Sequence, residues 1–549
     1  MSEFGVSRLR TFRADAKACS LHRQRNAAMN IKEKWQALLR CPREMWLMLL
    51  FKLLTSYGYF AVSAVLVLYL SAEHGYSDRG AATLYGVWGF AISGVGVFTG
   101  PLIDKLGIRK SVVLGALVSC VGMFGLAFAF TRSTMLIALL GVIPFGVSLA
   151  LAVLDVGGKR YSYAGNTTLV FSLLYSAMNV GASIAGISLD ILRSALGSST
   201  GGRFNSHGFS ASAERLLIMS AACTTCFAGL LAALTIREVD VSREGSVRPR
   251  LDLVAASTFE DDEFDVEEGT PPAQKPLWRR VLSAPVDLLR WYYNTALKSR
   301  LFWQVVAFTT ALMFVRQVFR QMDATLPKWT LRVLGPDAPI GRLYSINPTL
   351  IVLLTPLSSM LVDRWDIYNV IMAGSLVSAL SVFMLAGKVT LLAEIVALCA
   401  FTVGEAIYSA QATTFIMTLA PDGREGTYAQ ISNALVFMSK VPVGLLSGEL
   451  MERYCPAPVG DSYEKERRCS KVWLVIAFVA LGTPILLLLL KRFIYSADVQ
   501  HYISTQTHQV KSGTIVYSDN DADDDADFTV VDDNDSAPMS PQKVKQSKD

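Results

Sequence analysis

Long apolar stretches alternate with short polar segments along most of the chain. A bilayer core about 30 Å thick is crossed by about 20 apolar helical residues, and twelve stretches meet that requirement. The predicted spans are residues 45–71, 81–104, 110–131, 133–155, 167–192, 214–236, 301–325, 343–363, 367–387, 389–419, 426–450 and 471–493. The pattern predicts an all-α, polytopic membrane protein with twelve transmembrane helices in two six-helix bundles.

The composition supports a membrane protein and gives no sign of an enzyme. Of 549 residues, 52% are hydrophobic and 18% are charged, whereas charged residues make up about a quarter of a typical soluble domain. The histidines fall in loops and tails, and the Cys-x-x-Cys pair, Cys223 and Cys226, lies in an apolar span. We therefore expect no metal site, no cofactor and no nucleic-acid partner. The sequence also contains no phosphate-binding Gly-x-x-x-x-Gly-Lys loop and no constellation of nucleophile, base and metal ligands.

The polar segments set the topology and divide the chain into two halves. Residues 1–44 carry ten Lys or Arg against four Asp or Glu, so the positive-inside rule keeps them in the cytoplasm. They contain no apolar core of signal-peptide length and are not expected to be cleaved. An even number of spans then places the C-terminus in the cytoplasm too. The expected parts are a basic N-terminal segment at 1–44, an N-terminal bundle at 45–236, a cytoplasmic linker at 237–300, a C-terminal bundle at 301–493 and a disordered acidic tail at 494–549.

The linker has two different portions. Its middle, "FEDDEFDVEEG", is acidic, whereas "LWRRVLSAPVDLLRWYYNTALKS" can form an amphipathic helix interrupted at Pro285. Such a helix would lie along the inner face of the membrane. The alternative is a partly helical linker without membrane contact.

Two loops at equivalent positions in the halves carry a motif. "GPLIDKLGIRK" (100–110) follows the second span and "SMLVDRWDIYN" (359–369) follows the eighth. The first resembles the signature loop of the major facilitator superfamily, and the second is a weaker copy. The resemblance implies residues that hold the cytoplasmic side closed in one conformation; topological anchoring by the basic residues alone is the alternative. These gating candidates are Gly100, Asp104, Gly107, Arg109, Lys110, Asp363 and Arg364.

Longer stretches resemble one family of that superfamily, the proton-coupled oligopeptide transporters. They are "VFSLLYSAMNVGASIAG" (170–186), "YSINPTLIVLLTPL" (344–357) and "GEAIYSAQATTFIMTLAPDGREGTYAQISNA" (404–434). The resemblance covers most of the chain from Tyr57 to about Gly448. It implies the major facilitator fold, alternating access and a central cavity for small zwitterionic solutes. The substrate-binding candidates are Tyr57, Tyr59, Tyr175, Asn179, Asn347 and Glu405.

The first span departs from that family. The family's Glu-x-x-Glu-Arg-Phe-x-Tyr-Tyr motif falls on "KLLTSYGYF" (52–60). Lys52 replaces the first glutamate, and Thr55 and Ser56 replace the Glu-Arg pair. The resemblance associates this motif with proton coupling and with the substrate carboxylate, so both roles are in question here.

Glu405 is a carboxylate near the middle of a predicted span. A charged residue at that depth costs roughly 2.5–3.5 kcal/mol on insertion scales, so it is expected to face a wet cavity or a partner. The resemblance implies that Glu405 binds the substrate's amino group. The alternative is an internal ion pair, with Lys440 as the candidate partner. Packing alone is the alternative for the tyrosines, and interhelical hydrogen bonding is the alternative for Asn179 and Asn347.

Other charges within the spans form candidate pairs. Lys52 and Asp155, in the first and fourth spans, form one pair. Arg316 and Arg320 lie one turn apart in the seventh span, with Asp323 three residues further on. We expect an outer gate or an internal salt bridge there.

Two cysteines are candidates for a disulfide. Cys455 and Cys469 lie in the polar segment between the last two spans, which the topology places outside the cytoplasm. An oxidising compartment favours a bridge between them. Two free thiols in a polar loop are the alternative.

The sequence predicts a transporter of a small amino-acid-like or peptide-like solute, acting as a monomer in the lipid bilayer of the plasma membrane or an endomembrane organelle. The alternative is a non-transporting nutrient sensor on the same scaffold. Asp155 and Glu405 are the span carboxylates best able to carry a proton. If Asp155 pairs with Lys52 and Glu405 binds the solute, neither is free to titrate. We then expect a facilitator or exchanger rather than a proton symporter.

Overall fold

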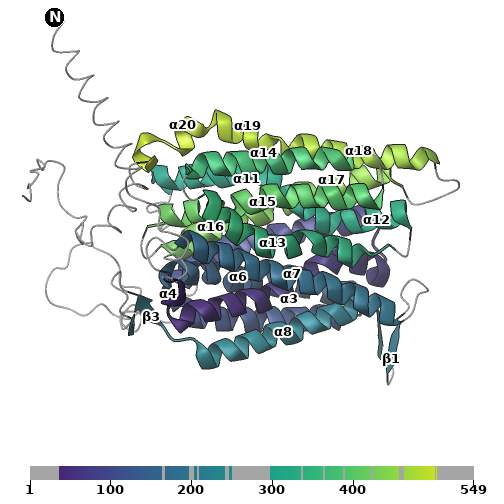
Figure 1. Ribbon diagram of the computed structural model, residues 1–549. Helices are drawn as coiled ribbons and strands as arrows, with labels where there is room; N and C mark the ends of the chain where they lie inside the picture. The colour runs from purple at the N-terminus through teal and green to yellow at the C-terminus, as the bar shows by residue number, and fades with distance from the viewer. Residues whose placement is uncertain are drawn as a thin grey trace, which may run out of the picture.

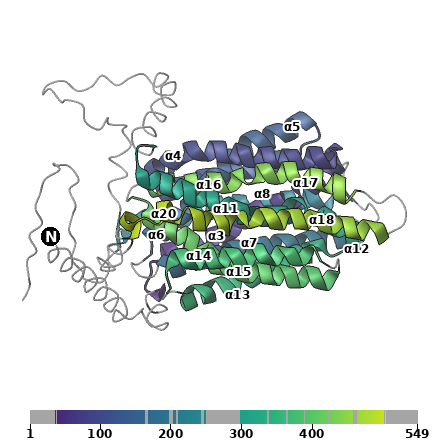
Figure 2. The same ribbon diagram turned by 90° about the horizontal axis from the view of Figure 1, so that it is seen from above.

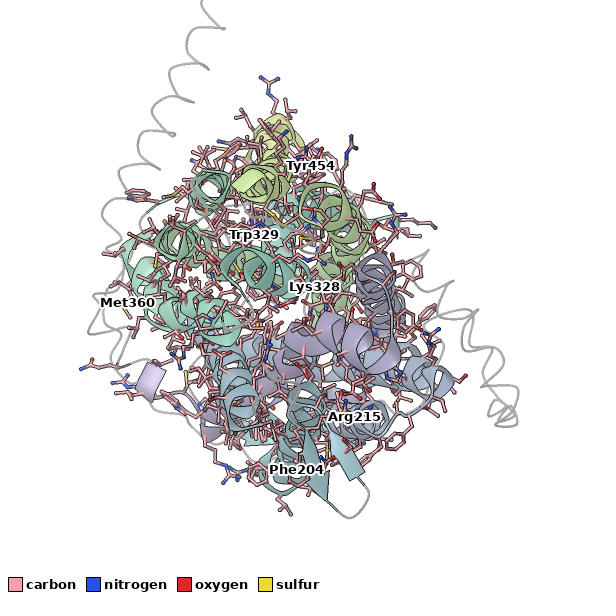
Figure 3. The ribbon with its side chains drawn as sticks, turned by 90° about the vertical axis from the view of Figure 1, so that its right-hand side faces the viewer. Phe204, Arg215, Lys328, Trp329, Met360 and Tyr454 are labelled. Atoms are coloured by element: carbon pink, nitrogen blue, oxygen red, sulfur yellow. A yellow bond between two sulfur atoms is a disulfide. The ribbon has the colours of Figure 1, made fainter. Side chains whose placement is uncertain are left out.

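The computed structural model describes residues 36, 38–162, 167–196, 203–206, 209–241, 247–249, 297–335, 338–362, 365–387, 390–421, 424–456, 463–500 and 503. Within these ranges long helices lie side by side with roughly parallel axes (Figures 1 and 2). The helices of the first half gather on one side of the bundle, and those of the second half gather on the other (Figure 3).

The first half is helical with two short antiparallel strand pairs. Its helices are α3 (Arg43–His74), α4 (Asp78–Ala127), α5 (Arg132–Leu136), the π-helix η1 (Ile137–Val142), α6 (Ile143–Arg160), α7 (Thr167–Leu196) and α8 (Ala213–Thr235). The strand pairs are β1 (Phe204–Ser206) with β2 (Phe209–Ala211), and β3 (Val239–Val241) with β4 (Val247–Pro249). β1 and β3 lie at opposite ends of the bundle (Figure 1). We name these ends the β1 end and the β3 end.

The second half is helical throughout its described residues. Its helices are α11 (Arg300–Ala324), α12 (Leu326–Leu334), α13 (Ile340–Val362), α14 (Ile367–Leu385), α15 (Leu391–Leu419), α16 (Glu425–Met438), α17 (Lys440–Tyr454), α18 (Tyr463–Ala480), α19 (Gly482–Leu489) and α20 (Lys491–Ile494). α12 was not expected from the hydropathy pattern, because it is far too short to span a bilayer. Pro327 lies in its first turn, where a missing N–H costs no helical hydrogen bond.

The described helices include eleven that are long and apolar enough to cross a membrane. One of them, α4, has 50 residues and would be about 75 Å long if straight, more than twice the thickness of a bilayer core. Its backbone breaks at Gly107, which has φ 78° and ψ 179°, a conformation that glycine adopts without the penalty a side chain would impose. α4 therefore supplies two spans, and the predicted twelve-helix fold is confirmed.

Some boundaries differ from the prediction. α3 continues to His74, whose Nε2 lies 3.1 Å from the hydroxyl oxygen of Tyr69. His74 therefore ends a spanning helix instead of lying in a loop. The residues after Leu70 are polar, but their backbone N–H groups still make helical hydrogen bonds. Residues 1–35, 250–296 and 504–549 are outside the described residues, so the basic N-terminal segment, the amphipathic linker helix and most of the acidic tail remain predictions. The start of the predicted disordered tail is different, because residues 497–500 are helical.

Glycines bring the backbones of the two halves close together at two places. A Cβ placed on Gly341 of α13 would lie 2.3 Å from the carbonyl oxygen of Gly186 of α7. A Cβ on Gly444 of α17 would lie 2.3 Å from the carbonyl oxygen of Ala82 of α4. Because no side chain fits in either place, these glycines allow backbone-to-backbone packing between the halves.

Candidate functional site

Glu405 lies midway along α15 and is held by two neutral side chains. It is 3% exposed. The hydroxyl of Tyr175 donates a hydrogen bond to Oε1 at 2.6 Å, and Nδ2 of Asn347 donates one to Oε2 at 2.7 Å. Tyr175 belongs to α7 in the first half, whereas Asn347 and Glu405 belong to the second. The carboxylate therefore joins the two halves near the middle of the bundle.

Buried acceptor atoms without a donor lie on the neighbouring amides. Oδ1 of Asn347 and Oδ1 of Asn179 are buried and have no hydrogen-bond partner. Asn179 lies one helical turn after Tyr175, and its Nδ2 donates to the backbone oxygen of Tyr175 at 2.8 Å. Buried acceptors are normally paired. The unpaired oxygen of Asn347, whose amide also contacts Glu405, therefore marks a place where a ligand with N–H donors could bind.

Lys440 does not pair with Glu405. Its Nζ donates to Oγ of Ser63 at 3.3 Å and lies 3.7 Å from the ring centroid of Trp88 and 4.2 Å from that of Tyr85. The expected alternative of a Glu405–Lys440 ion pair is therefore wrong. Lys440 begins α17, which packs against α4 rather than α15, and aromatic faces there stabilise its charge.

A second polar group is built around Asp323. Its Oδ2 accepts hydrogen bonds from Ser63 Oγ at 2.7 Å and Tyr85 Oη at 2.8 Å, and its Oδ1 accepts one from Tyr344 Oη at 3.1 Å. Arg320 lies 3.9 Å from Asp323 and donates to the hydroxyl of Tyr59 at 3.1 Å. We name this buried group, which draws on both halves, the Asp323 cluster; its members are Tyr59, Ser63, Tyr85, Arg320, Asp323, Tyr344 and Lys440.

At the β3 end the halves are joined through the signature loop. Asp104 accepts hydrogen bonds from the backbone N–H groups of Gly426 at 2.8 Å and Thr427 at 3.0 Å. Those N–H groups belong to the first turn of α16, where an anion is favoured by the helix dipole. Arg160 lies 3.2 Å from Glu425 in the same turn. Asp104 thus caps a helix of the opposite half.

The other residues of the loop have different roles. Arg109 donates through its side chain to the backbone oxygen of Ala233 at 2.6 Å rather than to Asp104. Gly100 packs against α16, where an added Cβ would lie 3.0 Å from Thr427 Cα. Lys110 is exposed. Asp363 and Arg364, the counterparts in the second half, are outside the described residues.

At the β1 end the halves are joined by ion pairs. Asp78, at the start of α4, lies 2.5 Å from Lys328 of α12 and also pairs with Arg332 of the same helix. Arg79 pairs with Glu449 of α17. Lys328 lies where helices of the two halves meet (Figure 3). The two halves therefore contact each other at both ends of the bundle, on either side of Glu405.

Lys52 and Asp155 form an ion pair inside the first half. Nζ of Lys52 lies 2.7 Å from Oδ1 of Asp155, and the side chains are 8% and 17% exposed. The pair joins α3 to α6. Lys52 and Asp155 thus each have a partner of opposite charge within the first half.

Comparison with known proteins defines the family. The sequence model of the Major Facilitator Superfamily matches residues 48–441. The chain belongs to the major facilitator superfamily. Proteins of this superfamily are transporters, so the chain is a transport protein rather than an enzyme, as predicted.

Similar proteins point to one branch of the superfamily. Dipeptide and tripeptide permease B of Shigella dysenteriae is 28% identical over 151 residues, 27% of this chain and 31% of the permease. The permease of the same name from Photorhabdus asymbiotica is 28% identical over 113 residues, 20% of this chain and 23% of the permease. The matched stretches thus span at most about a third of these curated relatives.

Solved structures share the fold of this major facilitator protein. A POT family transporter in complex with a thioalcohol conjugated peptide has a TM-score of 0.58 at 15% identity, covering 82% of this chain and 97% of that one. A POT family transporter in complex with 5-aminolevulinic acid has a TM-score of 0.57 at 16% identity, covering 82% and 97%. The resemblance to the oligopeptide transporters, seen first in the sequence motifs, is confirmed.

The predicted site residues of this superfamily member are only partly brought together. Tyr175, Asn347 and Glu405 meet, with Asn179 one turn away. Tyr59 belongs instead to the Asp323 cluster. Tyr57 hydrogen-bonds Ser220 of α8 at 2.7 Å, inside its own half. Sequence reasoning missed Ser63, Tyr85, Trp88 and Tyr344, because hydroxyls and aromatics are common in spans and carry no signal of a distant charge.

A disulfide supports α12 at the β1 end. Cys455 and Cys469 are bonded to each other. The indole N–H of Trp329 donates to the backbone oxygen of Cys469 at 3.1 Å, and Arg332 donates to that of Cys455 at 2.7 Å. The disulfide thus holds the helix whose Lys328 and Arg332 pair with Asp78.

Replacing both Cys455 and Cys469 by Ser is expected to lower the free energy of unfolding by about 3 kcal/mol, because the bridge closes a loop with a sequence separation of 14. Thermal unfolding of purified protein measures the loss. The control is a double Cys→Ser variant of the free cysteines Cys223 and Cys399, which should be nearly neutral. Mass spectrometry of unreduced protein that finds both thiols free would contradict the prediction.

Proposed function

We propose that this transporter carries a small amino-acid-like or peptide-like solute by alternating access, with Glu405 as the group that binds the solute's ammonium. The observation that carries the proposal is a mid-membrane carboxylate held only by neutral donors, Tyr175 and Asn347. Among the described residues no cation lies within 4 Å of Glu405. Its negative charge is therefore available to a cationic ligand.

The hydrogen-bonding capacity of the site suits an ammonium group. A primary ammonium has three N–H donors and no acceptor. Glu405 offers carboxylate lone pairs, and the adjacent Oδ1 of Asn347 is an unpaired buried acceptor. A charge-assisted hydrogen bond between an ammonium and this carboxylate would be strong in a site shielded from water.

The position of Glu405 between the halves fits alternating access. Tyr175 and Glu405 come from opposite halves, so a solute bound at Glu405 would alter the contact that joins them. The contacts of Asp104 at the β3 end and Asp78 at the β1 end would open in turn. The names of the similar proteins support the solute class: the permeases are named for dipeptides and tripeptides, and the solved transporters are in complex with a thioalcohol conjugated peptide or 5-aminolevulinic acid.

We propose that the β3 end faces the cytoplasm and that both termini lie there, in a multi-pass protein of the plasma membrane or an endomembrane organelle. α20 lies at this end, and it begins with Lys491 and Arg492 (Figure 1). The basic residues of the signature loop also belong to this end. We expect the functional unit to be a monomer, which size measurements in detergent would test.

Uptake of labelled solute into proteoliposomes tests the proposed function. Candidate amino acids and dipeptides are first screened for thermal stabilisation of the purified protein, since a ligand at 100 times its Kd stabilises by about 2.7 kcal/mol. A stabilising solute is then offered to the vesicles. Binding without uptake at any gradient would contradict transport and favour the nutrient sensor.

Uptake is expected to depend weakly on an imposed pH gradient, with the solute reaching equal concentrations on both sides. Asp155 pairs with Lys52, and in this proposal Glu405 is occupied by the solute, so neither carboxylate is free to carry a proton. Vesicles with and without an inward proton gradient provide the measurement. Concentrative uptake that a protonophore abolishes would show that a proton is coupled after all.

A further inference from the structure

A hollow lies at the β3 end between α3 and α8, two helices of the first half that pack against each other. It has a volume of about 420 Å³ and is lined by Arg43, Trp46, Leu47, Leu234 and Thr235. These residues belong to the first two turns of α3 and to the last turn of α8, which leads to β3 (Figure 1). None of them takes part in the contacts between the halves described above.

Exposed apolar side chains flank the hollow on its membrane side. On α3, Trp46 and Leu50 are each 40% exposed and lie one turn apart. On α8, Phe227, Leu230 and Leu234 are 57%, 55% and 85% exposed, and their spacing of three and four residues places them on one face of the helix. Both helices thus present apolar surface to the acyl chains of the bilayer directly beside the hollow.

Positive charge gathers at the rim of the hollow. Nε of Arg43 lies 3.2 Å from Oε1 of Glu44, and Nε of Arg237 lies 3.0 Å from the same oxygen. The two guanidiniums are therefore close neighbours, and one buried carboxylate offsets only one of their two charges. The arginine side chains are 59% and 61% exposed. Among the described residues, no acceptor bonds the terminal nitrogens of Arg237.

Capping of α8 explains these arginines only in part. Arginines near a helix C-terminus can bond the last carbonyl oxygens, and Arg109 does so with Ala233 at 2.6 Å. The contact of Arg43 with the backbone oxygen of Thr235 is long, at 3.4 Å, and Arg237 lies beyond the end of α8. A guanidinium is a planar fork of N–H donors that matches phosphate oxygens in a bidentate geometry. Two exposed forks side by side thus suit a phosphate group.

We propose that this hollow binds an anionic phospholipid, whose phosphate contacts Arg43 and Arg237 and whose acyl chains follow the exposed apolar faces of α3 and α8. Basic residues near the membrane attract the anionic lipids of the cytoplasmic leaflet, which is the side that the proposed topology gives to the β3 end. Tryptophan favours the depth of the headgroups, and Trp46 lies between the arginines and the apolar faces. The lipid would join α3 to α8 within the first half.

Lipids that differ only in the headgroup test this proposal. Purified protein in detergent is titrated with dioleoyl phosphatidylglycerol or with dioleoyl phosphatidylcholine. Thermal stabilisation gives the Kd, and native mass spectrometry gives the number of lipids retained. The anionic lipid is expected to bind about 10-fold more tightly, the order expected for two basic residues that share one carboxylate. Glycerol 3-phosphate, which has a phosphate but no acyl chains, should not stabilise the protein at the same concentration.

Two double variants show where the preference arises. Arg43→Gln with Arg237→Gln should abolish the preference for the anionic lipid and leave the Kd for phosphatidylcholine nearly unchanged. Arg300→Gln with Arg492→Gln is the matched control, because it removes two exposed arginines from the other half and should keep the preference. Arg492 belongs to α20 at the β3 end (Figure 1), and Arg300 begins α11, which contacts α20.

Each outcome supports or overturns the lipid site, whatever solute the protein transports. Equal binding of the two lipids by the wild-type chain overturns it, and this comparison stands even if the Arg43 and Arg237 variant fails to fold. Loss of the preference in the control variant also overturns it, because overall charge rather than the hollow would then attract the lipid. Equal stabilisation by glycerol 3-phosphate and phosphatidylglycerol would assign the hollow to a soluble phosphate instead of a lipid.

Discussion

Replacing Glu405 by Gln is expected to reduce solute uptake by about 30-fold or more. Removing one partner of a buried, hydrogen-bonded charge pair costs about 2–5 kcal/mol, and 1.4 kcal/mol corresponds to a factor of ten. Gln has nearly the same shape and can still accept one hydrogen bond from Tyr175 or Asn347. Folding should therefore be preserved, and the loss should fall on solute binding. Initial rates of uptake into proteoliposomes measure the effect.

A second glutamate on the same helix provides the control. Glu394 lies in the first turn of α15, is 1% exposed and accepts a hydrogen bond from Thr330 at 3.0 Å. Glu394→Gln makes the same chemical change in a buried place away from the site and should leave uptake near the wild-type rate. Normal uptake by Glu405→Gln would refute the assignment of Glu405.

Replacing Asp323 by Ala is expected to lower the free energy of unfolding by about 3–5 kcal/mol, the range measured when one partner of a buried ion pair is removed. Three hydroxyl groups, those of Ser63, Tyr85 and Tyr344, would lose their acceptor. The buried cations Arg320 and Lys440 would lose the carboxylate of their cluster. Thermal unfolding of the purified variant provides the measurement.

Two further variants show whether this loss comes from the cluster. Asp323→Asn keeps an acceptor oxygen and should be less destabilising than Asp323→Ala. Asp498→Ala removes an exposed carboxylate that lies 3.2 Å from Arg300, and exposed pairs contribute about 0–1 kcal/mol. Equal stability of Asp323→Ala and Asp498→Ala would mean that the cluster does not hold the halves together.

The spans were predictable from sequence because lipid imposes one strong requirement on every crossing segment. Backbone groups have no water to bond in the bilayer core, so each crossing must be a helix of sufficient length and apolarity. That requirement separated residues 81–104 from 110–131, and the backbone of α4 breaks between them at Gly107. The same reasoning marked Lys52, Asp155 and Glu405 as residues in need of partners, since a charge in an apolar span is conspicuous.

The partners themselves were harder to predict, because they come from distant parts of the chain. Tyr175 and Glu405 are 230 residues apart, and Ser63 and Asp323 are 260 apart. Which side chains meet depends on how the two halves pack, and a serine or tyrosine in a span looks the same whether it faces a carboxylate or a neighbouring leucine. Lys440 was misassigned for this reason: its aromatic neighbours on α4 are invisible in the local sequence.

The first part of α4 runs from one end of the bundle to the other (Figure 1). From Asp78 to Asp104 it is helical over about 39 Å at 1.5 Å per residue, with Pro101 inside it near the second tip. It carries the Asp78 and Arg79 ion pairs at one tip and the cap on α16 at the other. Because both tips contact the opposite half, we expect outward movement of one tip to be accompanied by inward movement of the other. Near its middle, a Cβ on Gly89 would lie 2.4 Å from Cβ of Lys440, so the Lys440 side chain packs directly against the backbone of α4. The backbone break at Gly107 separates this segment from the span that follows.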